Sequence, residues 1–230
     1  MKSKEFVLDE NTTVKVSKRS SSRSIRLTIA PSGEVRVSIP SWMPFRMGYD
    51  FAKSKTAWII EQKPNQTILT DSQPIGKNHQ LKFVPTDSTA ITTRLKELEA
   101  IVFLPKGTTF DSPQAQVAAK RVAKKALLAQ GKALLPIRLK QLAEKYEYSY
   151  NEVKVKSLKT RWGSCDSSQN ITLNLYLMTL PWELIDYVLL HELNHTQYMH
   201  HGPKFWGNLE TRLPKTKELR KELKNYKANI

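Results

Sequence analysis

The chain has 230 residues, which is enough for one large domain or two small ones, and enough to bury a core without disulfide bonds. It contains one cysteine, Cys165, so an intramolecular disulfide is excluded and a reducing compartment is favoured. Lysine and arginine number 37 against 21 acidic residues, which gives a net charge of +16 and a surface that attracts polyanions or anionic substrates.

This positive charge has two interpretations. It can indicate a nucleic acid or another polyanion as a partner, or it can simply keep the protein soluble. The first residues have no long apolar run after their lysines, and no later stretch is apolar for long enough to cross a bilayer. We therefore expect no signal peptide, no membrane partner and a cytoplasmic location.

Residues 1–110 are expected to form a β-rich N-terminal module. Residues 24–29 and 34–39 alternate polar and apolar side chains, and Pro31-Ser32-Gly33 between them predicts the turn of a β-hairpin. A helix is expected over residues 44–62, where apolar side chains recur near helical spacing.

Two further strands are expected in this module, at residues 79–84 and 100–104. The polar residues 86–93 between them predict a loop or a weak strand. We find no catalytic constellation in this part of the sequence.

Residues 111–230 are expected to form the helical catalytic region. Asp111-Ser112-Pro113 combines a capping residue with a proline in the first turn, which predicts a helix that runs to about Tyr146 and bends at Pro136. Basic residues four apart give this helix one positive face, which is formed by Lys120, Arg121, Lys124 and Lys125. Such a face is more often a solvated surface than a binding site. A second basic cluster lies at residues 215–224.

The last third of the chain carries the chemistry. Residues 152–156 and 170–175 alternate as strands do, and residues 160–166 between them predict an irregular connection. Pro181 then opens a helix that is apolar on most sides, so we expect this helix to be buried. It contains His191-Glu192-Leu193-Asn194-His195, an HExxH motif.

The spacing of this motif has a physical reason. Residues four apart lie on one helix face, so the imidazoles of His191 and His195 can reach one metal ion. Zinc lowers the pKa of a bound water towards ~7, and Glu192 is placed to take its proton as the general base. Because unpaired buried histidine and glutamate side chains are costly, an apolar helix makes a chance match less plausible. The motif predicts a zinc-dependent hydrolase.

A catalytic zinc needs a third protein ligand and one open position. The candidates are His200, His201 and Glu210. His201 has the metzincin spacing, HExxHxxGxxH, but Tyr198 stands where the glycine would be. Gly202-Pro203 allows the chain to turn one residue later, whereas Glu210 would give a site like that of thermolysin. The residues alone leave this choice open.

Five segments together resemble the YgjP-like metallopeptidase family, which is related to the SprT-like zinc peptidases: residues 161–165, 171–174, 185–188, 191–195 and 201–206. The ordered match covers about residues 150–210, and the sequence VRVSIP in the N-terminal hairpin is also similar. The resemblance implies His191, His195 and His201 as zinc ligands and Glu192 as the base. It also implies an α+β fold, which consists of a zincin-like metallopeptidase domain and the N-terminal β-rich module. In the zincin-like domain, a small sheet is expected to pack on the active-site helix.

Three neighbouring residues are candidate substrate contacts, each with a structural alternative. Arg161 either holds a substrate carboxylate or phosphate, or caps a loop. Asn174 either binds an extended peptide or stabilises the loop at the site. Tyr198 either assists an oxyanion or packs in the core, where we also expect the large aromatic residues Trp162, Phe205 and Trp206.

The function that we expect is hydrolysis of peptide bonds in a peptide or protein substrate. One alternative is a metal-dependent phosphohydrolase that acts on a nucleotide or another anionic substrate, since the positive charge and Arg161 suit it. A further alternative is a protease that associates with nucleic acid through its basic surface. The sequence does not indicate the physiological substrate or the oligomeric state.

Overall fold

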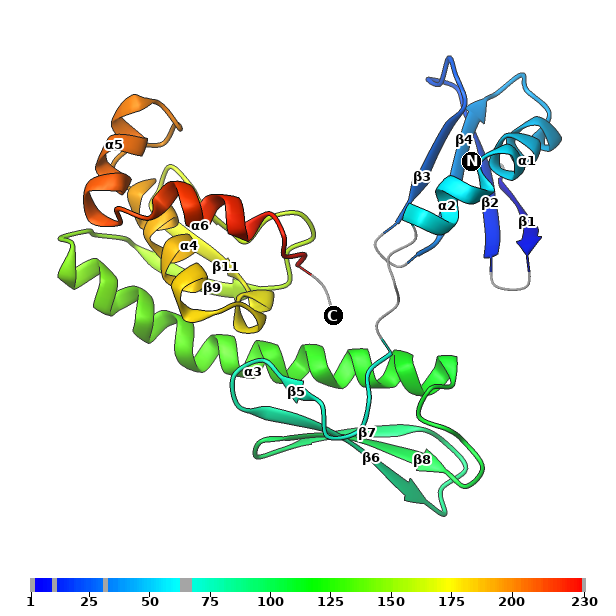
Figure 1. The fold of residues 1–230 in the computed structure, drawn as a ribbon, viewed down its shortest axis with the longest axis horizontal. Helices are drawn as coiled ribbons and strands as arrows, with labels where there is room; N and C mark the ends of the chain where they lie inside the picture. The colour runs from blue at the N-terminus through cyan, green and yellow to red at the C-terminus, as the bar shows by residue number, and fades with distance from the viewer. Residues whose placement is uncertain (1–2, 10–11, 31–32, 63–67, 229–230) are drawn as a thin grey trace. The chain divides into compact units, whose positions relative to one another are not determined.

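The computed structural model describes residues 3–9, 12–30, 33–62 and 68–228. The chain forms two compact units, residues 1–67 and residues 68–230 (Figure 1). Each unit combines a β-sheet with helices, so the α+β class is confirmed. Within the described ranges, no helix is both long and apolar enough to cross a bilayer.

The first unit is a four-stranded sheet with two helices. Its strands follow the order β1-β2-β4-β3, and the elements are β1 (Ser3–Asp9), β2 (Thr12–Arg19), β3 (Arg26–Ile29), β4 (Val35–Pro40), α1 (Phe45–Ser54) and α2 (Thr56–Gln62). The predicted hairpin is the antiparallel pair β3 and β4, while Pro31 and Ser32 of its expected turn lie outside the described residues. The single helix expected over residues 44–62 is divided at Lys55 into α1 and α2.

The second unit begins with another four-stranded sheet, of order β5-β6-β8-β7. Its strands are β5 (Pro74–Ile75), β6 (His79–Thr86), β7 (Thr92–Lys96) and β8 (Glu99–Pro105). The two predicted strands correspond to β6 and β8, which pair in parallel, and β7 begins inside the segment expected to be a loop or weak strand. This sheet packs against the long helix α3 (Pro113–Lys145).

The boundary between the units therefore differs from the expected one at residue 110. The buried side chains of the β5–β8 sheet, such as Leu81 and Val102, join the same apolar cluster as Leu127 of α3. The N-terminal sheet has a separate cluster, which includes Val16 and Val37. Shared burial, rather than strand content, decides which sheet belongs with the helical region.

Helix α3 connects the β5–β8 sheet to the C-terminal elements, which include the helix with the HExxH motif. It begins where the cap chemistry predicts, because the side chain of Ser112 accepts a hydrogen bond from the backbone N–H of Ala115 at 3.4 Å. It contains Pro136 and spans 33 residues, or about 50 Å at a rise of ~1.5 Å per residue. Figure 1 shows this single helix passing from the sheet to the group of α4, β9 and β11.

The C-terminal elements are a three-stranded sheet and the helices around it. The sheet has the order β10-β11-β9, and its strands are β9 (Glu152–Lys156), β10 (Gly163–Cys165) and β11 (Asn170–Asn174). The expected irregular connection therefore contains a short strand, β10, because residues 163–165 pair antiparallel with β11. There follow the 3-10 helix η1 (Leu175–Thr179), α4 (Trp182–Asn194), α5 (Pro203–Arg212) and α6 (Thr216–Leu223).

Helix α4 is buried on most of its sides, as its apolar sequence predicts. Leu184, Val188 and Leu190 are among its side chains in the apolar cluster of the second unit. The C-terminal end of this helix carries the HExxH residues.

Candidate metal centre

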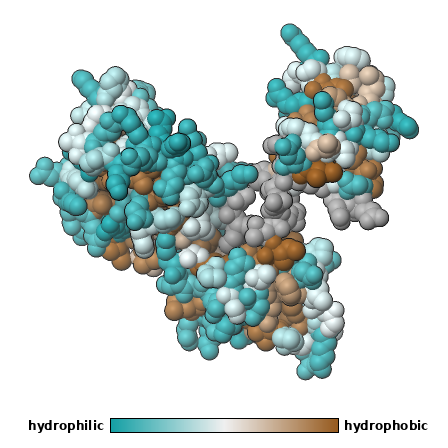
Figure 2. All heavy atoms as spheres, viewed as in Figure 1, coloured by the Kyte–Doolittle hydropathy of each residue, from teal (hydrophilic) through white to brown (hydrophobic). Residues whose placement is uncertain are grey.

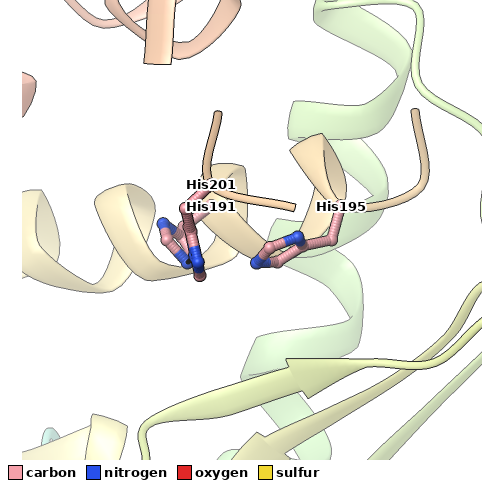
Figure 3. A group of neighbouring side chains, drawn as sticks. All are labelled: His191, His195 and His201. Carbon is pink, nitrogen blue, oxygen red and sulfur yellow. Dashed lines mark hydrogen bonds between the residues drawn. The ribbon is translucent and has the colours of Figure 1, made fainter. Parts of the chain in front are cut away.

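Three histidines meet at the end of α4. His191 lies in the last turn of the helix, His195 follows its final residue, and His201 lies just before α5. Each offers one ligand nitrogen, and these three atoms lie within 4.8 Å of one another (Figure 3). The Nε2 atoms of His191 and His201 are 3.0 Å apart.

The chemistry of this group fits a metal ion. Burial lowers the pKa of His191 to about 3 and lowers the pKa of both His195 and His201 below the usual value. The imidazoles are therefore neutral near pH 7, which is the form that binds metals. Nitrogen ligands at ~2.1 Å from a tetrahedral ion lie about 3.4 Å apart. The 3.0 Å between the Nε2 atoms of His191 and His201 is near this value, and the other separations stay within 4.8 Å.

Hydrogen bonding also fits a metal site. The Nδ1 of His195 lies 3.1 Å from the backbone carbonyl oxygen of Tyr198, so this nitrogen carries the proton and donates it. The other ring nitrogen of His195, Nε2, keeps a free lone pair, as in many metal-ligating histidines. The Nδ1 of His191 is buried and has no hydrogen-bond partner among the described residues. A metal ion held by the Nε2 atoms would offset the burial of these rings, but it would not supply a partner for the Nδ1 of His191.

The other candidate ligands lie outside this group. The carboxylate of Glu210 forms an ion pair with Lys217, with Oε1 and Nζ 3.4 Å apart. His200 has an exposed side chain and does not belong to the histidine group. Of the three candidates for a third ligand, the structure brings His201 together with the two helix histidines.

Glu192 lies buried beside strand β10. Its side chain is 5% exposed, and burial raises the pKa of its carboxyl to about 8, while the nearby positive charge of Arg161 opposes this shift. A Cβ atom on Gly163 would lie 2.6 Å from Oε1 of Glu192. Any side chain at position 163 would therefore overlap the space that the Glu192 carboxylate occupies. Sequence reasoning did not assign this role to Gly163, because only the fold brings β10 against α4.

The loop before β10 is held by Asn174. This residue is fully buried, and its amide nitrogen donates to the carbonyl oxygens of Leu158 at 3.0 Å and Arg161 at 2.8 Å. Its amide oxygen accepts a bond from the backbone N–H of Tyr176. Of the two roles left open by the sequence, these contacts match stabilisation of the loop. The side chain of Arg161 itself is exposed.

A second asparagine ties α4 to α5. Asn194 is fully buried within the HExxH motif, and its amide nitrogen donates to the carbonyl oxygen of Phe205 at 2.8 Å. Its amide oxygen accepts from the hydroxyl of Tyr148 at 2.9 Å and from the amide of Asn208 at 2.6 Å. The loop that carries His201 is thus clamped at both ends. Its sequence signal is a polar residue inside an apolar helix.

Two further residues surround His201. Trp206 stacks on the imidazole of His201, and the guanidinium of Arg220, from α6, lies 4.4 Å from the centre of the indole ring. Trp206 is half-buried and contacts the histidine group in addition to packing against the core that we expected for it. Tyr198 contributes its backbone carbonyl to His195, while its ring packs against the core.

Comparison with known proteins gives one family, and solved structures that include two metallopeptidase zymogens. The family model described as YgjP-like, metallopeptidase domain, matches residues 23–226. The metallopeptidase zymogen abylysin of Pyrococcus abyssi is 24% identical, with 39% of this chain and 91% of that chain covered and a TM-score of 0.36. The metallopeptidase zymogen jannalysin of Methanocaldococcus jannaschii is 22% identical, with 40% and 94% covered and a TM-score of 0.35. No curated protein sequence matches.

Proposed function

This chain belongs to the YgjP-like metallopeptidase family, and from that membership we propose that it is a zinc-dependent peptidase of the HExxH type. His191, His195 and His201 would hold the zinc, and Glu192 would be the general base. The observation that carries this proposal is the approach of the three histidine nitrogens to within 4.8 Å of one another. Zinc, when bound, supplies a Lewis acid that polarises the peptide carbonyl and makes water more acidic.

Glu192 has the environment of a proton carrier. Without a metal, burial raises the pKa of its carboxyl to about 8, and a cation bound beside it would favour the carboxylate form that a general base needs. The carboxylate of Glu192 would take a proton from the attacking water and deliver it to the nitrogen of the leaving amine. Burial beside Gly163 restricts the position of this carboxylate, so the proton is transferred from a defined place.

Strand β10 favours a peptide as the substrate. It is an edge strand of its sheet, so one side of its backbone has no partner strand in the described part of the chain. An extended peptide can add to such an edge through main-chain hydrogen bonds. Because Gly163 of β10 packs against the Glu192 carboxylate, a peptide on this edge would pass close to the proposed base. The exposed Arg161 would bind a carboxylate of that peptide.

The test is a hydrolysis assay with the full chain, loaded with one equivalent of zinc. A peptide library and a panel of nucleotides are incubated with the wild-type protein and with Glu192→Gln. We expect hydrolysis of peptides by the wild type, and a loss of about 10²–10⁴-fold in Glu192→Gln with zinc retained. Glu183→Gln, on the exposed first turn of α4, is the matched control and should keep full activity.

Two results would refute the proposal. Hydrolysis of nucleotides without hydrolysis of peptides would favour the phosphohydrolase. Peptide hydrolysis that continues undiminished in Glu192→Gln would show that another group accepts the proton of the water.

A further inference from the structure

A basic groove lies on α3, and none of the three histidines lines it. It has a volume of about 430 Å³, which is in the range of ligand sites, and its walls come from α3, from the end of β9 and from the start of η1. We call it the α3 groove and define it by the five cationic side chains that line it: Arg121, Lys124, Lys125, Lys132 and Lys156.

The cations of the α3 groove have no anionic partners in the described part of the chain. None of the five takes part in an ion pair or a side-chain hydrogen bond with any described residue. The one acidic residue of α3, Glu144, lies beside Lys140, outside the groove. Like charges at neighbouring helical positions repel each other, so this arrangement is destabilising until an anion binds.

The other basic cluster of the sequence differs in this respect. On α6, where Figure 2 shows mainly hydrophilic residues, Lys217 pairs with Glu210 and Arg220 lies over the ring of Trp206. Two of its cations thus have partners within the protein. The α3 groove is the better candidate for an external ligand.

The floor of the α3 groove is aliphatic. Leu128, Val155 and Leu175 line it, and no aromatic side chain does. Single-stranded nucleic acids are usually held by bases stacked on aromatic rings, which this groove does not offer. A phosphate backbone would also leave the aliphatic floor without a contact. A peptide can use both features, because its carboxylates reach the rim while an apolar side chain covers the floor.

We propose that the α3 groove binds an acidic segment of the protein substrate, with carboxylates on the lysines and an aliphatic side chain on the floor. This inference rests on the proposed peptidase function, because it places the substrate of that site. The groove would act as a second binding site on the same substrate, outside the catalytic centre.

The groove is joined to the catalytic centre by a short stretch of chain. Lys156 and Ser157 line the groove, and the next residues form the loop that Asn174 holds before Gly163. Leu175, in the floor, directly follows Asn174. A peptide long enough to span the groove and the histidines would be held at both places, which would raise its effective concentration at the metal. Such binding lowers KM and leaves kcat nearly unchanged.

Binding can be measured without cleavage in the full-length Glu192→Gln protein. The probe is a fluorescein-labelled peptide with a leucine between two pairs of glutamates, followed by anisotropy at low salt. We expect Lys124→Gln/Lys125→Gln to raise its Kd about tenfold, since it removes two charge contacts. Lys120→Gln/Lys140→Gln is the matched control, because it removes the same charge from the same helix outside the groove.

Two further probes separate the possible ligands. Exchange of the central leucine for asparagine should weaken binding severalfold, because the floor then loses its contact. Duplex and single-stranded DNA are used as competitors. The proposal is overturned if the control double variant weakens binding as much as the groove variant, or if the leucine has no effect. It is also overturned if DNA displaces the peptide and if DNA itself binds Lys124→Gln/Lys125→Gln more weakly than the protein without these two changes. The groove would then bind phosphates.

Kinetics distinguish a failure of the groove from a failure of the peptidase. For the wild type, KM should be lower for a peptide substrate with an acidic tail than for the same substrate with a glutamine tail. Lys124→Gln/Lys125→Gln should abolish this difference in KM. This variant should still cleave the glutamine-tailed peptide at the normal rate. Equal cleavage of both tails by the wild type would overturn the groove and leave the peptidase intact. Binding of the acidic peptide without hydrolysis of any peptide would support the groove and refute the proposed function.

Discussion

The indole of Trp206 holds the residue His201 in two ways. The two rings stack with their centres 5.5 Å apart, and the Nε1–H of Trp206 donates a hydrogen bond to the backbone carbonyl oxygen of His201 at 3.0 Å. His201 lies in a loop, so it lacks the helical hydrogen bonds that fix His191 and His195. The contacts with Trp206 restrain His201 in place of those helical hydrogen bonds.

Replacing Trp206 should therefore weaken the metal site. Trp206→Phe keeps an aromatic ring but loses the hydrogen bond, and we expect the affinity for zinc to fall about 10–100-fold, as for other residues that orient metal ligands. Competition with a chromophoric chelator measures this affinity. Trp182→Phe, at the start of α4, is the control and should bind zinc as the wild type does. If Trp206→Phe binds zinc as tightly as Trp182→Phe does, Trp206 does not orient the metal ligand.

The two consecutive histidines of the loop should behave differently. His201→Ala should lose stoichiometric zinc, because it removes one of three grouped nitrogens, whereas the exposed His200 lies outside the group. Elemental analysis of His200→Ala and His201→Ala after dialysis against zinc-free buffer measures the difference. Loss of zinc in His200→Ala alone would show that the ligand assignment is wrong.

A single methyl group on β10 should impair catalysis without removing the metal. The Cβ of Gly163→Ala would lie 2.6 Å from Oε1 of Glu192, so the carboxylate must move. We expect kcat to fall about 100-fold, because a displacement near 1 Å can cost this much. Gly207→Ala is the control, because a Cβ there meets nothing within 4 Å. Normal turnover with Gly163→Ala would mean that the position of Glu192 is not critical.

The clamp at Asn194 should contribute to stability as well as to the site. Asn194→Ala leaves the carbonyl of Phe205 and the hydroxyl of Tyr148 without this partner in a buried place. Each unsatisfied group costs about 1–3 kcal/mol, so the free energy of unfolding should fall by at least ~2 kcal/mol. Urea denaturation of the metal-free protein measures it. Asn225→Ala, with an exposed side chain, should leave the midpoint unchanged.

The parts of the site that lie on one helix could be predicted from the sequence. The fourfold spacing of His191 and His195 determines that they share a face, whatever the rest of the fold does. His201 could be chosen over His200 only through the resemblance to a family, because the conformation of a loop is not encoded in a local period. The choice depends on the clamp at Asn194 and on Trp206, which act through tertiary contacts.

Other features were missed because they arise between distant segments. Strand β10 has three residues, which is too short for an alternation to be visible, and its pairing with β11 defines it. The boundary between the two units could not be predicted from the sequence either, since the strands on both sides of residue 67 alternate polar and apolar residues in a similar way. What separates them is the core that each one joins.

The continuous apolar cluster of the second unit has a thermodynamic consequence. It runs from Leu81 on β6 through Leu127 on α3 to Leu189 on α4. We therefore expect the β5–β8 sheet and α4 to unfold in one cooperative transition. Heat should melt both together, and the metal should be released at the temperature at which the distant sheet is lost. A cavity made by Leu81→Ala would then lower the temperature of metal release, although Leu81 is no part of the metal centre.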